Sequence, residues 1–180
     1  MRLKDKTAIV TGGASGFGEG IVRRFSEEGA RVMVADINGD AARKVAQTYG
    51  GVACVVDVAD RTSVENMATR AEEELGHVDI LVNNAGVTHL PQPLDAVSED
   101  DFDRVFAVNC KSVFLTTRAC VPAMKDRGRG AILNVASTAG VSPRPNLNWY
   151  NASKGWMITA TRTMAVELAS GGIRVNAINP

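Results

Sequence analysis

The strictest constraint on the fold of this chain is the alternation of two hydrophobic patterns along its 180 residues. Short apolar, β-branched runs predict buried strands, and stretches with apolar residues at helical spacing separate them. The predicted strands span 7–11, 31–35, 52–56, 79–82, 131–135 and 173–178, and the predicted helices span 19–28, 40–49, 62–75, 99–125 and 150–169. We therefore expect an α/β fold with a doubly wound parallel sheet and helices on both faces, in a single domain over residues 1–180. Pro122 is expected to kink or shorten the end of its helix.

Composition excludes several classes of partner. Lys and Arg number 20, as do Asp and Glu, so the formal net charge is zero, which argues against a nucleic-acid or anionic-membrane binder. No apolar run approaches the ~20 residues that span a bilayer, and Met1 to Lys6 lacks a signal-peptide layout. Cys54, Cys110 and Cys120 lack ligand-like spacing, so we expect buried, reduced thiols, no metal site and a cytoplasmic location.

A glycine-rich turn joins the first predicted strand to the first predicted helix. It contains Gly12, Ser15, Gly16, Phe17 and Gly18. Such a turn lets the backbone approach a pyrophosphate, and the helix N-terminus offers free N–H groups and a positive dipole end. A plain tight turn is the alternative. Because the turn lies at the first strand-to-helix crossover, we favour nucleotide binding.

Asp36 ends the second predicted strand. A carboxylate there can accept hydrogen bonds from an adenosine ribose and would repel a 2′-phosphate. Neither Ile37 nor Ser15 offers a cation for that phosphate, so the sequence favours NAD over NADP. A loop-capping Asp is the alternative.

Two further strand ends carry polar residues. After the third strand, Asp57 and Val58 can contact adenine, although Asp at a strand end is also a common turn former. After the fourth, Asn83-Asn84-Ala85-Gly86 suits a wall against a flat ligand, with Asn83, Ala85 and Gly86 as cofactor contacts. Asn83 could also tie neighbouring strands together, because adjacent buried amides need partners.

Tyr150 and Lys154 lie four residues apart at the start of the last predicted helix, on one helical face. A positive charge beside a phenol favours the phenolate and lowers the phenol pKa, which suits a catalytic acid/base. Taken alone, the spacing equally fits a partly buried Tyr beside a solvated Lys.

The ordered set Thr11-Gly12-x-x-x-Gly16-x-Gly18, Asn83-Asn84-Ala85-Gly86, Asn109, Ser137 and Tyr150-x-x-x-Lys154 closely resembles the short-chain dehydrogenase/reductase family over the whole chain. The resemblance implies a Rossmann-like fold and hydride transfer between NAD and an alcohol or carbonyl substrate. It implies that Tyr150 is the acid/base, that Lys154 lowers its pKa and binds the nicotinamide ribose, that Ser137 polarises the substrate oxygen, and that Asn109 holds a water of a proton relay.

The resemblance also implies a homotetramer or homodimer, built partly on the helices that start near Glu99 and Tyr150. Family members usually continue for about seventy residues after the position of Pro180, so we expect the sequence to lack a final strand and a substrate lid. A non-catalytic dinucleotide-binding redox sensor is the alternative function. Within the enzyme class, a sugar or polyol dehydrogenase competes with a 3-oxoacyl reductase.

Some further residues are candidates for a role at the site or at an interface. His77 is expected at the surface, and His89 could line the substrate mouth. Arg144 could bind an anionic substrate group, although a solvated loop charge is preferred. We expect Trp149 near the substrate and Trp156 at a subunit interface.

Overall fold

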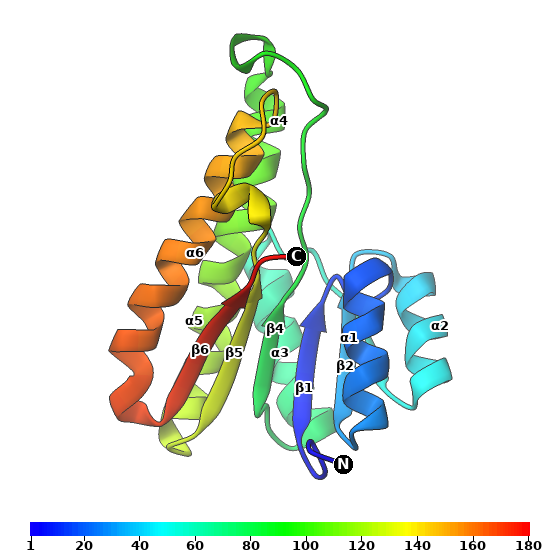
Figure 1. Cartoon of the computed structure of the whole chain (residues 1–180). Coiled ribbons are helices and arrows are strands. Elements are labelled where there is room, and N and C mark those ends of the chain that lie inside the picture. Colours follow the sequence, from blue (N-terminus) through cyan, green and yellow to red (C-terminus); the bar gives the residue numbers. More distant parts are fainter.

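The computed structural model describes residues 1–180 and confirms the predicted parallel α/β architecture. Six strands form one sheet in the order β3-β2-β1-β4-β5-β6, and all neighbouring pairs are parallel (Figure 1). They are β1 (Thr7–Thr11), β2 (Arg31–Asp36), β3 (Val52–Val55), β4 (Ile80–Asn83), β5 (Gly130–Val135) and β6 (Ile173–Ile178). The chain runs outward from β1 to β3, then returns to the other side of β1. Ligands bind at such a reversal, outside the carboxyl ends of the strands.

Helices cover both faces of the sheet. They are α1 (Gly16–Glu27), α2 (Gly39–Tyr49), α3 (Arg61–Leu75), α4 (Glu99–Phe106), α5 (Ser112–Asp126) and α6 (Asn148–Leu168). The first two pack on one face around β1 and β2, whereas α3, α5 and α6 pack on the other (Figure 1). An apolar core lies on each face of the sheet, and successive residues of β1 point to opposite faces: Val10 packs in one core and Ile9 in the other. Burial on both faces explains why the strands read as continuous apolar runs. No helix combines the length and apolar character needed to cross a bilayer.

The predicted helix over 99–125 is interrupted by a π-helical turn. This turn, η2 (Ala107–Lys111), lies between α4 and α5 and contains Asn109. Pro122 lies inside α5, which continues to Asp126, so the expectation that Pro122 shortens the helix is wrong. Buried Val121 and Met124 keep this last part of α5 packed on the sheet despite the missing N–H of proline.

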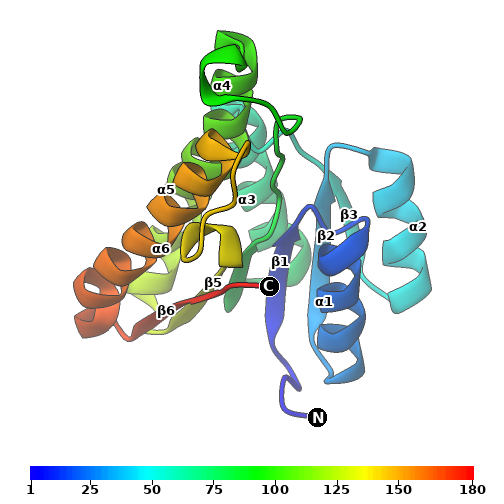
Figure 2. The ribbon, with the colours of Figure 1, turned by 45° about the horizontal axis from the view of Figure 1, so that its top comes forward.

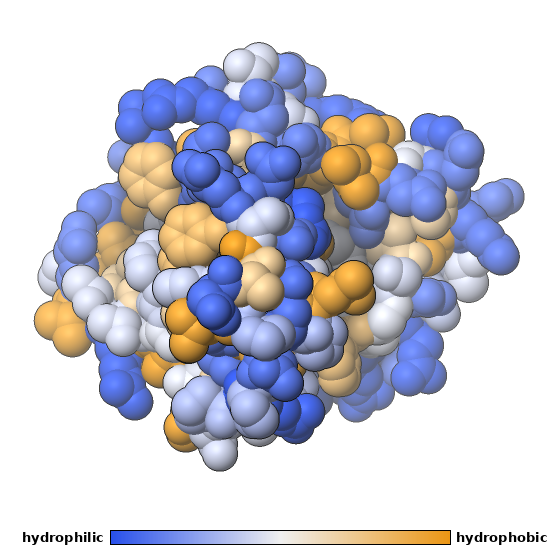
Figure 3. Space-filling model, turned by 90° about the horizontal axis from the view of Figure 1, so that it is seen from above, coloured by the Kyte–Doolittle hydropathy of each residue, from blue (hydrophilic) through white to orange (hydrophobic).

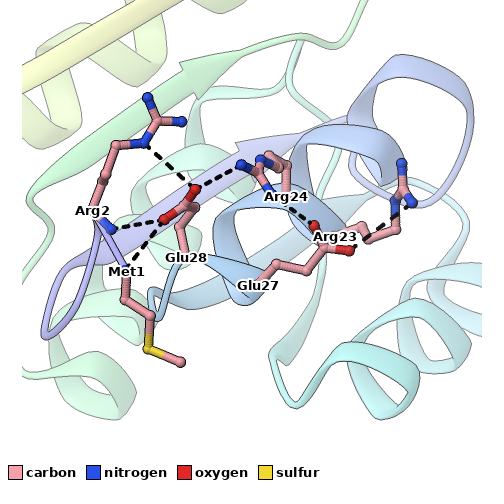
Figure 4. A network of polar contacts seen from close by, with 6 residues as sticks. All are labelled: Met1, Arg2, Arg23, Arg24, Glu27 and Glu28. Atoms are coloured by element: carbon pink, nitrogen blue, oxygen red, sulfur yellow. Dashed lines mark hydrogen bonds and ion pairs between the residues drawn. The ribbon is translucent and has the colours of Figure 1, made fainter.

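The N-terminal segment is tied to the end of α1, at the edge of the sheet opposite the carboxyl ends of the strands (Figure 1). The Glu28 carboxylate accepts hydrogen bonds from the backbone N–H of Arg2 at 2.8 Å and from Arg24 Nη2 at 2.7 Å (Figure 4). The Arg2 hydrogen bond, followed by the charges of Arg24, Arg2 and the N-terminus, lowers the pKa of Glu28. This ionic network is therefore structural and lies away from the ligand-binding edge.

Candidate active site

Two cavities adjoin at the carboxyl ends of β1 and β4. The first, about 430 Å³, is lined by the glycine turn and the ends of β2 and β3, and the second, about 260 Å³, is lined by residues of β5 and α6. Four residues line both: Phe17, Asn84, Gly86 and Val87. Viewed onto this edge, the surface is hollowed between groups of apolar side chains (Figure 3). A ligand that enters the first cavity can therefore extend into the second.

The glycine turn is built for close backbone approach. Gly12 has φ +60°, and a Cβ there would lie 2.9 Å from Ala85 Cα. A Cβ on Gly18 would lie only 1.9 Å from the Gly12 carbonyl oxygen. Ser15, the N-cap of α1, makes no side-chain capping hydrogen bond, so no side chain of the cap satisfies the first N–H groups of α1. Free donors at a helix N-terminus, beside a cradle without side chains, fit a pyrophosphate.

Asp36 and Ile37 line the first cavity at the end of β2. The Asp36 carboxylate accepts hydrogen bonds from the backbone N–H of Ala14 at 3.0 Å and of Asn38 at 2.9 Å. Asp36 thus also holds the glycine turn against β2, which is the loop-capping role considered above as the alternative to a ribose contact. Ile37 is 72% exposed and offers an apolar surface at the cavity rim.

Asp57 and Val58 line the same cavity after β3. Asp57 Oδ1 accepts a hydrogen bond from the backbone N–H of Ala59 at 2.9 Å, which is the turn-forming role considered as the alternative. Its second carboxylate oxygen has no hydrogen bond from a protein group and remains available to a ligand.

The two adjacent asparagines after β4 point to different places. Asn83 is buried and donates to Asn134 Oδ1 at 2.9 Å, so its side chain lies in the core and does not line either cavity. Of its two predicted roles, the tie between strands is the one seen. Asn84, which we had not assigned, lines both cavities, and its Nδ2 donates to the carbonyls of Thr11 and Gly12, each at 2.9 Å. The alternation of side chains along a strand could have separated the two.

Tyr150 and Lys154 line the second cavity from the first turns of α6. Lys154 Nζ lies 5.8 Å from the centre of the Tyr150 ring and donates to the Val135 carbonyl at 2.9 Å. The Lys154 side chain is nearly enclosed, and burial lowers the pKa of its ammonium to about 8, with a smaller opposing effect of Cys110. The cation is therefore close to the phenol, but it is poorly solvated and anchored on β5.

Gly86 provides room for that cation. A Cβ on Gly86 would lie 3.3 Å from Lys154 Nζ and 3.4 Å from Asn109 Oδ1. The first distance is closer than an ordinary van der Waals contact and the second lies at its lower limit. Glycine at the end of the wall thus lets the ammonium and the amide approach the cavity.

Ser137 follows β5 and begins a 3₁₀ turn, η3 (Thr138–Gly140), which lies beside the chain end after β6 (Figure 2). Its Oγ accepts a hydrogen bond from the Ala139 N–H at 3.1 Å and faces the second cavity. The accepted bond orients the hydroxyl, and its hydrogen is left for an oxygen atom in the cavity.

Asn109 lies in the π-helical turn, fully buried behind the cavity wall. Its Oδ1 accepts from the Val87 N–H and its Nδ2 donates to the Val87 carbonyl, both at 2.8 Å. Nδ2 also donates to Ser153 Oγ at 2.9 Å. Asn109 therefore clamps the chain after the Asn-Asn-Ala-Gly wall to α6, a contact that sequence reasoning did not anticipate.

Two other sequence candidates lie outside the second cavity. His89 is fully buried, with Nδ1 2.8 Å from the Leu90 carbonyl, and does not line the cavity as considered. Arg144 is exposed and forms no ion pair, in agreement with the preferred reading as a solvated loop charge.

The remaining aromatic and histidine candidates also have clear positions. Trp149 packs edge-on against Phe102 at 5.4 Å, near the start of α6. His77 is partly exposed and lies 3.1 Å from Asp79 Oδ2. Trp156, on α6, lines an open groove of about 710 Å³ between α5 and α6.

Comparison with known proteins supports this geometry. The family model described as short chain dehydrogenase matches residues 6–180. The chain is 46% identical over 187 residues to 4-formylbenzenesulfonate dehydrogenase TsaC1/TsaC2 of Comamonas testosteroni, an alignment that covers 100% of this chain and 73% of that protein. It is 40% identical over 185 residues to the 3-oxoacyl-[acyl-carrier-protein] reductase FabG of Thermotoga maritima, covering 100% of this chain and 75% of that one.

Two solved structures superpose closely on this chain. A 3-ketoacyl-(acyl-carrier-protein) reductase from Brucella melitensis complexed with NADH superposes with a TM-score of 0.98 at 44% identity, covering 99% of this chain and 76% of that one. An NAD⁺-bound xylitol dehydrogenase superposes with a TM-score of 0.95 at 34% identity, covering 100% of this chain and 71% of that one.

Proposed function

This chain belongs to the short-chain dehydrogenase/reductase family, a family of oxidoreductases, and from that premise we propose that it transfers a hydride between NAD(H) and a secondary alcohol or carbonyl compound. The single observation that carries the proposal is the convergence of Ser137, Tyr150 and Lys154 on one cavity that adjoins the glycine-turn cavity. When bound, a nicotinamide cofactor supplies or accepts the hydride. The residues of the chain must supply position, charge and proton transfer.

Tyr150 is the proposed acid/base. In alcohol oxidation its phenolate takes the hydroxyl proton, and in carbonyl reduction its phenol returns a proton to the oxygen. The Lys154 ammonium lies 5.8 Å from the centre of the Tyr150 ring, where it attracts negative charge that develops on Tyr150 during proton transfer. The free hydrogen of the Ser137 hydroxyl donates to the substrate oxygen and stabilises negative charge that develops there. We propose that Asn109 positions this set by fixing the cavity wall to α6, in addition to any water that it holds.

NAD is the proposed cofactor. The residues of the first cavity fit a dinucleotide, because the glycine cradle excludes side chains and the α1 N-terminus offers free donors. Among the residues that line this cavity, Asp36 and Asp57 are the only charged ones and both are acidic. A 2′-phosphate would therefore meet carboxylates and no cation. The two similar structures with NADH and NAD⁺ support the same choice.

A non-catalytic dinucleotide sensor is the competing function. A sensor needs the glycine turn and Asp36, but it does not need a buried ammonium beside a phenol or an oriented hydroxyl across the same cavity. Lys154 could serve a sensor as a contact of the nicotinamide ribose, but the Tyr150 phenol and the oriented Ser137 hydroxyl would have no use there. The sensor hypothesis is therefore the weaker one.

The decisive experiment is Tyr150→Phe, which removes one oxygen atom. We expect turnover to fall by about 10²- to 10⁴-fold while the Kd for NADH, measured by fluorescence, stays within about threefold. Tyr49→Phe, a phenol on α2 outside both cavities, is the matched control and should retain full activity. Turnover that survives Tyr150→Phe would refute the proposed mechanism, and NADH binding without turnover in the unsubstituted protein would favour the sensor.

The proposal keeps two substrate classes, polyols and 3-oxoacyl thioesters, because the similar proteins include enzymes named for each. Similar proteins include sorbitol and galactitol dehydrogenases at 39% identity as well as the FabG reductase at 40%. Polyols and 3-oxoacyl thioesters should therefore be assayed side by side by NADH absorbance.

We also propose that a second copy of the chain covers the groove between α5 and α6. Its lining includes Phe114, Trp156 and Met164, of which Phe114 is 50% and Trp156 is 40% exposed. An exposed apolar surface of this kind is typical of a subunit interface. A cytoplasmic dimer or tetramer is the expected assembly, and a monomer in sedimentation velocity at micromolar concentration would contradict it.

A further inference from the structure

Four buried polar side chains form a continuous chain of hydrogen bonds beneath the second cavity. Thr116 of α5 donates to Asn83 Oδ1 of β4 at 2.7 Å, and Asn83 donates to Asn134 Oδ1 of β5 at 2.9 Å. Asn134 donates in turn to Thr161 Oγ1 of α6 at 2.8 Å. All four side chains are at most 5% exposed. We call them the amide–hydroxyl network.

Every link of this network pairs a donor with an acceptor. Thr161 also donates to the Met157 carbonyl at 2.7 Å, so both its hydrogen and a lone pair are used. If both amides were turned over, the hydroxyls would exchange roles and each link would persist. Each nitrogen and oxygen of the network thus has a hydrogen-bond partner in either arrangement, as is usual for polar atoms in a core.

The network lies where apolar side chains would pack without difficulty. The surrounding core is apolar, with Ile132, Leu115 and Met157 nearly inaccessible to solvent. Apolar contacts tolerate small sliding and rotation of a helix on a sheet, whereas a hydrogen bond restricts both distance and direction. A satisfied buried network therefore favours one arrangement of the four elements over its near neighbours.

The position of Thr161 on α6 connects the network to the chemistry. At 3.6 residues per turn, Thr161 shares one face of α6 with Tyr150 and Lys154. On β5, Asn134 directly precedes Val135, whose carbonyl accepts from Lys154, and Ser137 follows shortly after. The hydrogen bond between Asn134 and Thr161 and that between the Val135 carbonyl and Lys154 thus attach α6 to β5 at two points. Two points define both the rotation and the axial position of α6.

We propose that the amide–hydroxyl network is a positioning device for catalysis, with Asn134 and Thr161 as positioning residues that hold α6 in register with β5. The network sets the separation between Tyr150 on α6 and Ser137 after β5. It also fixes β4, where Asn83 directly precedes the Asn84-Ala85-Gly86 wall. This inference rests on the proposed function of the site.

The proposal makes a distinctive kinetic prediction. Tyr150 and Lys154 lie on the same helix and move together, so loss of the network changes the distance to Ser137 and leaves the phenol–ammonium pair intact. Thr161→Val should lower kcat by about 10- to 100-fold, because a displacement of about 1 Å can have that effect on a reacting group. The pKa seen in the pH profile of kcat and the Kd for NADH should remain unchanged.

Matched variants separate positioning from general stability. Thr161→Ser retains the hydroxyl and should restore most of kcat. Thr48→Val on α2 is the control, because the exposed Thr48 hydroxyl bonds only to the Lys44 carbonyl of its own helix, outside both cavities and the groove between α5 and α6. Each kcat is measured well below the melting temperature of the variant. If Thr161→Val is too unstable to purify, Thr161→Ala, with its higher helix propensity, takes its place.

Two results would overturn the inference. One is a kcat of Thr161→Val equal to that of Thr48→Val in a protein whose turnover depends on Tyr150. The other is a crystal structure of Thr161→Val in which Tyr150 and Ser137 keep their separation, a readout that needs no activity. Failure of the proposed function is distinguishable, because the protein would then lack Tyr150-dependent turnover whatever stands at position 161.

Discussion

The two halves of the sheet build their sites by different means. On the β1–β3 side, the cavity is shaped by backbone: glycines without room for a Cβ and the N–H groups that begin α1. The helices there pack through an apolar cluster. On the β4–β6 side, the cavity is shaped by side chains from several elements, above the amide–hydroxyl network. A backbone site needs close approach, whereas a side-chain site needs alignment of elements distant in sequence.

The largest effect is expected on the backbone side, from Gly18→Ala. A Cβ there would lie 1.9 Å from the Gly12 carbonyl oxygen, and main chain cannot rotate away as a flexible side chain can. We expect a loss of about 3 kcal/mol or more in the free energy of unfolding, measured by urea denaturation, together with loss of NADH binding. Gly16→Ala is the control: a Cβ there meets nothing within 4 Å, and only its φ of +54° costs energy, about 1–2 kcal/mol. Equal losses in the two variants would show that close packing is not what this turn requires.

The next effect concerns the buried charge on the side-chain side. Burial lowers the pKa of Lys154 from 10.5 to about 8, so the folded chain binds fewer protons than the unfolded chain between these pH values. Protonated Lys154 therefore destabilises the fold below pH 8, and stability recovers as the pH rises toward 10.5.

Lys154→Met should accordingly stabilise the protein at pH 7 while abolishing turnover. We expect a gain of about 2 kcal/mol, which is the relieved desolvation less the hydrogen bond lost at the Val135 carbonyl. Urea denaturation at pH 7 and pH 9.5 measures it, and the difference from the unsubstituted protein should shrink at the higher pH. Lys125→Met, at an exposed lysine of α5, should show neither effect. A destabilised Lys154→Met at pH 7 would mean that the ammonium contributes to the fold.

The smallest effect is expected from Asp36→Asn in the first cavity. The change removes the negative charge that faces the proposed ribose site and keeps the shape of the side chain, although the amide can accept only one of the two backbone hydrogen bonds that Asp36 accepts. We expect the ratio of kcat/KM for NADP to that for NAD to rise by about tenfold, because like-charge repulsion of a 2′-phosphate is relieved. Asp40→Asn, an exposed acid on α2 whose partner is Arg43, should leave the ratio unchanged. An unchanged ratio in Asp36→Asn would show that Asp36 serves only to hold the glycine turn.

The sequence predicted the architecture well because the signals for it are local. Apolar runs and glycine turns mark each strand and each crossover, and all six predicted strands occur in one parallel sheet. The glycine turn and the ends of β2 and β3, which the sequence predicts as cofactor contacts, line one cavity, and their binding of a cofactor stays a prediction.

Features that depend on contacts between distant segments were missed. No local sequence pattern predicts the side-chain hydrogen bonds of Asn109, which lies in the π-helical turn, or those that Thr116 and Thr161 make within the network. These hydrogen bonds join residues of different helices, strands and loops. The roles of Asn83 and Asn84 differ because successive side chains of a strand point to opposite sides. On the β4–β6 side, the spacing of Tyr150 and Lys154 indicated an acid/base pair, whereas Ser137 and Asn109 were singled out only through the resemblance to a known family.

The missing side chain of Gly86 has an evolutionary consequence. Even a methyl group at this position would lie within 3.4 Å of both the Lys154 ammonium and the Asn109 amide. If the proposed proton chemistry is what maintains this close approach, relatives that lost the chemistry but kept the fold should tolerate a larger residue at position 86.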